Sequence, residues 1–231
     1  MSLKINNFVS KIPKILLWLC VIFVTGCIVK VFVWEQMYYA SKDGTARATA
    51  APAEVEYEEQ EVSEEDVTQE QVKQHVVAPD RPRYLTIEKL GVQNARIIEV
   101  GIAKDGKMGV PTGIFDVGWY NNSSKPGGNG TLLMDGHNGG PTRAGVFKKL
   151  DTLKSGDKII VERGDGIKFT YEVVENKTMS VEEANSYMGT MQKTPVAGKE
   201  SLSLITCTGE WTNVRRTYLS RAMVRAVLVE N

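Results

Sequence analysis

The sequence predicts an all-β domain with a few short helices over residues 84–231, preceded by a membrane anchor and a linker. Three observations predict this domain. Short segments with alternating apolar and polar residues follow one another from Tyr84 onward, glycine-containing turns separate them, and helical periodicity is scarce. Such alternation is typical of strands that have one buried face. Many short strands in succession favour an antiparallel barrel or sandwich.

Residues 15–34, "ILLWLCVIFVTGCIVKVFVW", form the first element, and Lys30 is their only charge. As a helix this segment would be about 30 Å long, which matches the hydrocarbon core of a bilayer. Lysines precede it in residues 1–14, so this end should remain in the cytoplasm and the rest of the chain should lie outside. A cleaved signal peptide and a lipidated Cys27 after "VTGC" are alternatives. The apolar run continues through Trp34, which favours an uncleaved single span.

Residues 35–83 are predicted to be an acidic, flexible linker. Within them, residues 41–83 hold eleven acidic residues against five basic ones and have few apolar side chains to bury. The chain as a whole has 231 residues and no net charge, so its bulk charge does not indicate nucleic-acid binding.

Seven segments of the folded region are predicted strands. The fourth and fifth of them form a hairpin through the turn Gly164-Asp165-Gly166. The strands are "RYLTIEKL" (83–90), "ARIIEVGI" (95–102), "TLLMDG" (131–136), "KIIVERG" (158–164), "IKFTYEVVE" (167–175), "SLSLITC" (201–207) and "RAMVRAVLV" (221–229). Helices are expected only at 181–188 and 144–150.

The folded region has a single cysteine, Cys207, because Cys20 and Cys27 lie in the apolar N-terminal run. A disulfide framework within the domain is therefore excluded. There is no CxxC pair and no His/Cys cluster, so we expect neither a metal nor a cofactor. Cys207 ends an alternating strand, and Thr208-Gly209 is predicted to break that strand. A nucleophile and a buried structural thiol are both open readings of such a position.

His137 is the one histidine of the folded region, and it too follows a predicted buried strand. A thiolate needs a base or a cation nearby to form near neutral pH. An oxyanion formed during acyl transfer needs a fixed positive group. Arg221 opens the last strand, which should pair with the strand of Cys207, whereas Arg216 lies in a predicted loop.

These motifs resemble those of the sortases, the membrane-anchored cysteine transpeptidases of bacterial surfaces. The resemblance covers residues 84–231 and is carried by "DGH" (135–137), "GVFKKLDTLKSGDKIIV" (145–161) and "LSLITC" followed by a strand that opens with arginine. The stretch "GWYNNSSKPGG" (118–128) before the histidine strand is similar to that of class F or class D-like members. The family resemblance implies an eight-stranded sortase-type β-barrel after a transmembrane helix and a disordered acidic tether.

The resemblance also implies a site and a reaction. Cys207 would be the nucleophile, His137 the acid/base, and Arg221 the stabiliser of the oxyanion, with Arg216 as the second candidate. Thr206, Trp119 and Tyr120 are the expected substrate-binding residues. The substrates would be secreted surface proteins with an LPxTG-type sorting signal. Their acyl group would pass, through a thioester, to an amine of a cell-wall precursor or a pilin lysine.

Three other functions remain open from the sequence. An L,D-transpeptidase also uses cysteine and histidine, but its cysteine follows Ser-x-Gly, whereas Ile205-Thr206 precede Cys207 here. A membrane-tethered β-barrel that binds a partner without catalysis is the main alternative. A hydrolase of the same fold, in which water replaces the amine, is the third.

Overall fold

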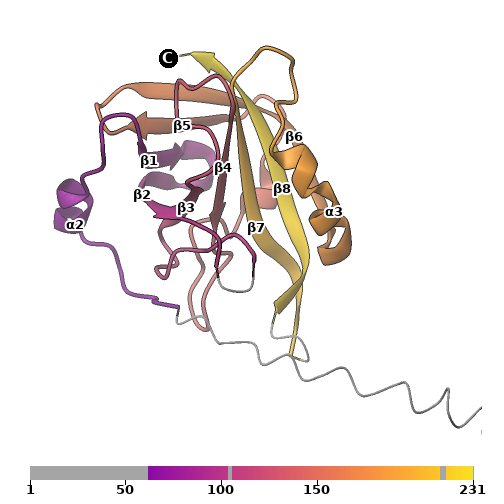
Figure 1. Ribbon diagram of the computed structural model, residues 1–231. Helices are drawn as coiled ribbons and strands as arrows, with labels where there is room; N and C mark the ends of the chain where they lie inside the picture. The colour runs from indigo at the N-terminus through magenta and orange to yellow at the C-terminus, as the bar shows by residue number, and fades with distance from the viewer. Residues whose placement is uncertain (1–61, 104–105, 214–216, 231) are drawn as a thin grey trace, which may run out of the picture. The chain divides into compact units, whose positions relative to one another are not determined.

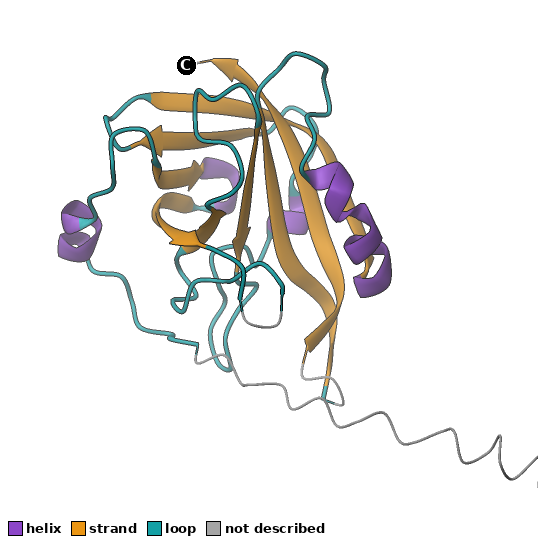
Figure 2. Ribbon diagram, in the orientation of Figure 1, coloured by secondary structure: helices purple, strands orange, loops and turns teal. Residues whose placement is uncertain are grey.

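The computed structural model describes residues 62–103, 106–213 and 217–230, which form one closed β-barrel with helices outside it (Figure 1). The predicted anchor at 15–34 lies outside these residues. Within the described ranges, no helix has the length and apolar character needed to cross a membrane. The predicted eight-stranded barrel is confirmed, and strands make up most of the domain (Figure 2).

The barrel order is β1-β2-β3-β4-β7-β8-β6-β5, closed by the pairing of β1 with β5. The strands are β1 (Pro82–Ile87), β2 (Val92–Val100), β3 (Val117–Tyr120), β4 (Thr131–Gly136), β5 (Lys158–Arg163), β6 (Lys168–Ser180), β7 (Ser201–Thr212) and β8 (Thr217–Glu230). The helices are α2 (Gln69–Gln74) and α3 (Val181–Met191), with short 3-10 turns η2 (Glu88–Leu90) and η3 (Leu150–Thr152).

Two strand pairs are parallel, so the prediction of an antiparallel barrel is wrong at these positions. The pairs are β2 with β3 and β4 with β7, and all other neighbours are antiparallel. Parallel neighbours need a long crossover connection, which a local pattern of alternation cannot reveal. The pairing of β4 with β7 matters for function, because the carboxyl ends of both strands meet at the same end of the barrel.

The barrel interior is filled by apolar side chains from every strand, and a second apolar cluster lies between the outer face and α3. The interior cluster includes Trp119, Leu132, Phe147, Tyr171, Leu202 and Leu204, all almost completely buried. The outer cluster joins Leu133, Met223 and Ile205 to Ala184 and Met191 of α3. The predicted helix at 181–188 is therefore confirmed. It begins with a capping box, in which Ser180 and Glu183 each bond the other's backbone N–H.

The predicted hairpin at 164–166 is confirmed, whereas the predicted helix at 144–150 is wrong. Gly166 has a left-handed φ of 87° in the turn between β5 and β6. At 145–147 the backbone N–H groups donate to the carbonyls of Asn138, Ile114 and His137, and the following amides bond three residues back, Lys148 to Gly145 and Leu150 to Phe147. The segment therefore forms 3-10-type turns that lead into η3 instead of an α-helix.

Strand β7 does not end at Cys207 as predicted, because it continues through Thr212. The pairing with β8 shifts register between Thr208 and Trp211, and Gly209 has a φ of 81° there. Thr208-Gly209 thus forms a bulge within the strand instead of a terminating turn. Cys207 consequently lies inside a paired strand, just before this bulge.

The predicted flexible linker is also wrong in its last part, since residues 62–83 contact the barrel. The backbone of Ser63 pairs with Gly113, and the His75 ring lies 3.0 Å from the carbonyl oxygen of Ile97. The Tyr84 hydroxyl donates to the carbonyl of Val72 in α2. Polar composition suggested a solvated segment, but its side chains and backbone find specific partners on the barrel.

Candidate active site

Cys207 and Arg221 lie directly opposite each other on the antiparallel pair β7 and β8. Directly opposite residues have Cβ atoms about 5 Å apart and project from the same face of the sheet. Leu202 and Leu204 point into the barrel core, so alternation directs Cys207 and Ile205 to the outer face. The predicted pairing of the cysteine strand with the terminal arginine strand is confirmed.

His137 leaves β4 at the same end of the barrel. Strands β4 and β7 run parallel in register through Asp135 and Ile205. One residue further on, the Thr206 hydroxyl donates to the carbonyl of Gly136 at 2.7 Å. His137 and Cys207 are the next residues along the two strands. The backbone positions of His137, Cys207 and Arg221, which are distant in the sequence, therefore lie at the same part of three neighbouring strands.

The His137 ring is held by the backbone. Its Nε2 lies 2.7 Å from the carbonyl oxygen of Pro111. A carbonyl can only accept, so Nε2 carries the proton and donates, and Nδ1 is left to exchange a proton. Among the described residues no hydrogen bond joins this ring to Cys207, and such bonds often tighten only when substrate is present.

Pro111 is a site residue that sequence reasoning missed. It contributes a main-chain oxygen 26 residues before the histidine, so no side-chain type could have indicated it.

The half-buried thiol of Cys207 has opposing influences on its pKa. Burial is the largest influence and raises the pKa of the thiol above its ordinary value; the positive charge of Arg221 lowers it in part, and a negative charge on Asp135 raises it further. The Arg221 guanidinium is itself held by the carbonyls of Tyr218 and Ser220, each at 2.9 Å. The arginine is thus the group that favours the reactive thiolate.

Asp135 is the unusual group near this site. Only 8% of it is exposed, and its Oδ1 has no hydrogen-bond partner among the described atoms. Its side chain packs against Gly118 on β3, so closely that a Cβ atom at position 118 would overlap Oδ1 of Asp135. Burial raises the pKa of Asp135 well above its ordinary value, which favours the neutral carboxyl. The neutral form spares Cys207 a neighbouring negative charge.

The Asp135 carboxyl should make stability depend on pH. The unfolded chain loses this proton near about pH 3.9, whereas the folded chain keeps it, so the wild type loses stability as pH rises above that value. Asp135→Asn cannot ionise. It should therefore gain stability relative to the wild type between about pH 4 and about pH 7. Urea unfolding across this range measures the difference.

Asp157→Asn is the control with the opposite sign, because a bond from Lys89 lowers the pKa of Asp157. This variant should be less stable than the wild type at neutral pH, and the deficit should vanish below about pH 4. A stability difference for Asp135→Asn that does not change with pH would show that the buried carboxyl is already ionised.

The expected substrate-binding residues occupy different environments. Trp119 is 2% exposed in the barrel core and donates from Nε1 to the carbonyl of Ser124, so its placement in a substrate wall is wrong. Its size and aromatic character suit a core equally well, and here they fill one. Thr206 is buried and uses its hydroxyl to join β7 to β4. Tyr120 alone packs with the outer cluster and remains half-exposed.

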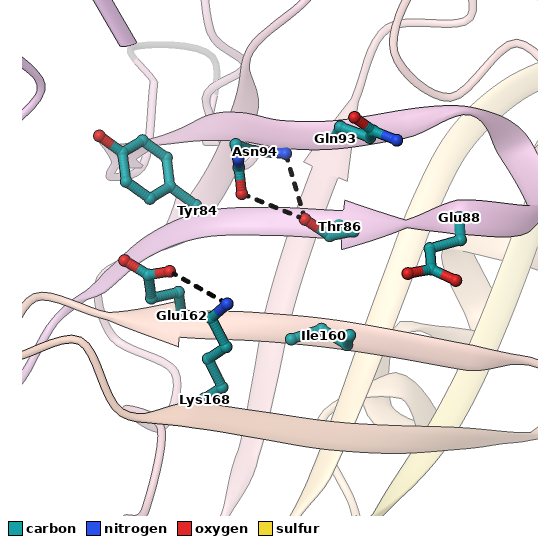
Figure 3. A pocket seen from close by; sticks show the side chains of 8 residues that line it. All are labelled: Tyr84, Thr86, Glu88, Gln93, Asn94, Ile160, Glu162 and Lys168. Carbon is teal, nitrogen blue, oxygen red and sulfur yellow. Dashed lines mark hydrogen bonds and ion pairs between the residues drawn. The ribbon is translucent and has the colours of Figure 1, made fainter. Parts of the chain in front are cut away.

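A separate hollow is lined by residues of η2, β1, β2, β5 and the start of β6, none of which carries Cys207, His137 or Arg221 (Figure 3). Some of its polar groups have partners: the backbone N–H of Asn94 donates to Thr86, and Lys168 pairs with Glu162. No group of three or more potential metal ligands gathers within the described ranges.

A cysteine beside a guanidinium, with a histidine on the neighbouring strand, has the components of nucleophilic acyl-transfer catalysis. The sortase domain family model matches residues 85–229, and the chain belongs to the sortase family. Sortases are cysteine transpeptidases, so the chain is an enzyme of that general kind. No curated protein sequence matches it.

Three solved sortase structures are similar to this chain at low sequence identity. The SrtA sortase from Actinomyces oris is 22% identical, with a TM-score of 0.47, covering 66% of this chain and 82% of that one. A sortase D5 transpeptidase from Clostridium perfringens is 24% identical, with a TM-score of 0.46, covering 71% and 91%. Sortase C-1 from Actinomyces oris is 24% identical, with a TM-score of 0.47, covering 71% and 81%. The family assignment rests on the family model.

Proposed function

We propose that the protein is a membrane-anchored sortase that cleaves an LPxTG-type sorting signal through a thioester on Cys207. It then transfers the acyl group to an amine, in cell-wall anchoring or pilus assembly. The observation that carries this proposal is the register of three strands. Cys207 pairs with Arg221, and His137 follows Gly136, to which Thr206 is hydrogen-bonded.

The reaction has two halves. The Cys207 thiol passes its proton to Nδ1 of His137. The resulting thiolate attacks the carbonyl carbon of the scissile peptide bond, and Arg221 stabilises the oxyanion that forms. His137 gives a proton to the leaving amine, the C–N bond breaks, and a thioester remains. An incoming amine then loses its proton to His137 and attacks the thioester, which releases the thiolate. This cycle uses the nitrogen Nδ1 that the Pro111 contact leaves open.

Substitution of Arg221 tests its electrostatic role. Arg221→Ala should lower kcat by about 10²- to 10³-fold, the usual loss for one oxyanion donor. It should also shift the alkylation of Cys207 by iodoacetamide to higher pH, because the arginine lowers the pKa of that thiol. Arg221→Lys should keep most of the thiol effect. An unchanged alkylation profile in the alanine variant would contradict the role and direct attention to Arg216, which lies outside the described residues.

The anchor and the location belong to the same proposal. Residues 15–34 would cross the cell membrane once, with residues 1–14 in the cytoplasm and the catalytic domain outside. This orientation supports a role on exported surface proteins and on amines of the wall precursor or of pilins. The assignment to a class F or class D-like branch rests on the motif "GWYNNSSKPGG".

The test incubates the full chain, in detergent, with a library of pentapeptide signals and several amines. Mass spectrometry should detect an acyl adduct on Cys207 for some peptides, and amine addition should convert the adduct to the transfer product. Cleavage without amine transfer would indicate a hydrolase. Absence of any adduct would favour a membrane-tethered binding module.

A further inference from the structure

The first described residues of the chain cross two loops that flank His137. We call residues 62–66 the N-terminal strap; it begins the coloured part of the chain in Figure 1. One loop carries Pro111, whose carbonyl accepts from His137. The other is the histidine loop, residues 138–145, which directly follows His137. The strap forms hydrogen bonds with both loops.

Ser63 connects the strap to the Pro111 side. Its backbone N–H donates to Thr112 at 2.9 Å, and its carbonyl accepts from Ile114 at 3.0 Å. The side chain of Ile114 is completely buried, and its carbonyl accepts from Val146 at 2.8 Å. These bonds fix the backbone on the C-terminal side of Pro111, and with it the acceptor of the imidazole.

Glu64 connects the strap to the histidine loop. Its carboxylate accepts from the backbone N–H groups of Thr142 and Arg143, at 2.8 and 2.9 Å, and from the Thr142 hydroxyl. These bonds lower the pKa of Glu64, the Thr142 hydroxyl most. Gly140 packs so closely that a Cβ atom there would overlap Glu64 Oε1. The loop returns to its start, where the N–H of Phe147 donates to the carbonyl of His137 at 3.0 Å.

Asp66 adds less than Glu64. It pairs with Arg143, but the two side chains are 76% and 42% exposed, and exposed ion pairs contribute little. The Glu64 carboxylate instead receives two directed backbone donors, and charge-assisted bonds of this kind are about twice as strong as neutral ones. Glu64 is therefore the residue on which the strap depends.

We propose that Glu64 is a positioning residue for His137, and that the strap holds the imidazole in place through the histidine loop and Pro111. The inference rests on the proposed catalytic role of His137. It makes residues 62–66 a working part of the catalytic domain, whose functional boundary lies well before residue 84. Residues 35–61 separate this end of the domain from the predicted anchor at 15–34.

The test compares Glu64→Ala and Glu64→Gln with Glu65→Ala in the full chain in detergent. Glu65 is the matched control, because it is exposed and no described contact uses its side chain. Glu64→Ala should lower kcat by about 10- to 100-fold with little change in KM, as expected for a misplaced catalytic group. Glu64→Gln keeps one acceptor oxygen and should retain part of the rate. Equal kcat values for Glu64→Ala and Glu65→Ala would overturn the proposal.

A second measurement does not depend on catalysis. Nitrogen-15 resonances of the imidazole rings report which nitrogen carries the proton, and His75 serves as an internal reference. In Glu64→Ala the His137 resonances should move away from the Nε2–H form while those of His75 stay in place. If the His137 resonances in Glu64→Ala are the same as in the wild type, the positioning role of Glu64 is overturned. This outcome can be measured whether or not the protein transfers peptides. Absence of transfer by the wild type, with the resonance change present, would instead count against the proposed function alone.

Discussion

Replacement of Cys207 by alanine is expected to abolish peptide cleavage and amine exchange, with a loss of about 10⁴-fold or more in kcat. Cys207 is the one cysteine among the residues that the structure describes, and alanine cannot form the thioester. The measurement is the rate of transfer product in the presence of a cleavable peptide and an amine. Mass spectrometry should find no acyl adduct on the variant.

Ser203→Ala is the control for disturbance of strand β7. Ser203 lies on the same face of the strand, but its hydroxyl only donates to the carbonyl of Met191 at 2.7 Å. This variant should keep most of the activity. Cleavage and exchange that survive in Cys207→Ala would end the proposal of catalysis at this residue, whereas loss in both variants would indicate damage to the strand.

Replacement of His137 by alanine should lower kcat by about 10²- to 10⁴-fold, the usual contribution of a positioned acid/base group. The leaving amine would lack a proton donor, and the incoming amine would lack a base. The loss should appear in both acylation and thioester resolution, which single-turnover measurements separate. His137→Gln tests shape, since glutamine can still donate to the Pro111 carbonyl but cannot exchange a proton in the same way.

His75→Gln is the matched control, because the second histidine contacts the carbonyl of Ile97 and lies outside the site. Its activity should stay near that of the wild type. A similar fall in kcat in His75→Gln and His137→Ala would show that the loss of activity comes from reduced stability and not from lost proton transfer. Retained activity in His137→Ala would remove the acid/base assignment.

Local pattern predicted most strands correctly, because alternation directly reports which face of a strand is buried. The segment "TLLMDG" became the fully buried β4, and the turn at 164–166 joined β5 to β6. The predicted helix at 144–150 is wrong because the amides of Lys148 and Leu150 bond three residues back in 3-10-type turns, which local pattern does not distinguish from an α-helix. The strand end predicted at Cys207 failed because a glycine with positive φ can form a bulge as well as a turn.

The residues of the candidate site were likewise predicted only in part. Residue type and strand position were enough to select Cys207, His137 and Arg221 as candidates. Trp119 was misplaced because an aromatic residue gives the same signal in a core and in a binding wall. The sequence did not indicate the contacts of Pro111 and Glu64. Pro111 contributes a backbone oxygen, which no side-chain type reveals, and Glu64 lies in an acidic stretch whose composition is typical of a solvated linker.

By itself the sequence determined the all-β class of the domain, the number of available nucleophiles and histidines, and the motifs of the sortase family. These properties depend on residue identity and on short-range periodicity. Only the tertiary structure decided that β4 and β7 run parallel, that Arg221 faces Cys207, and that residues 62–66 bind beside His137. The physical reason is that pairing register and backbone hydrogen bonds join residues as far apart in the sequence as Pro79 and Asp165. Such contacts depend on how the whole barrel closes.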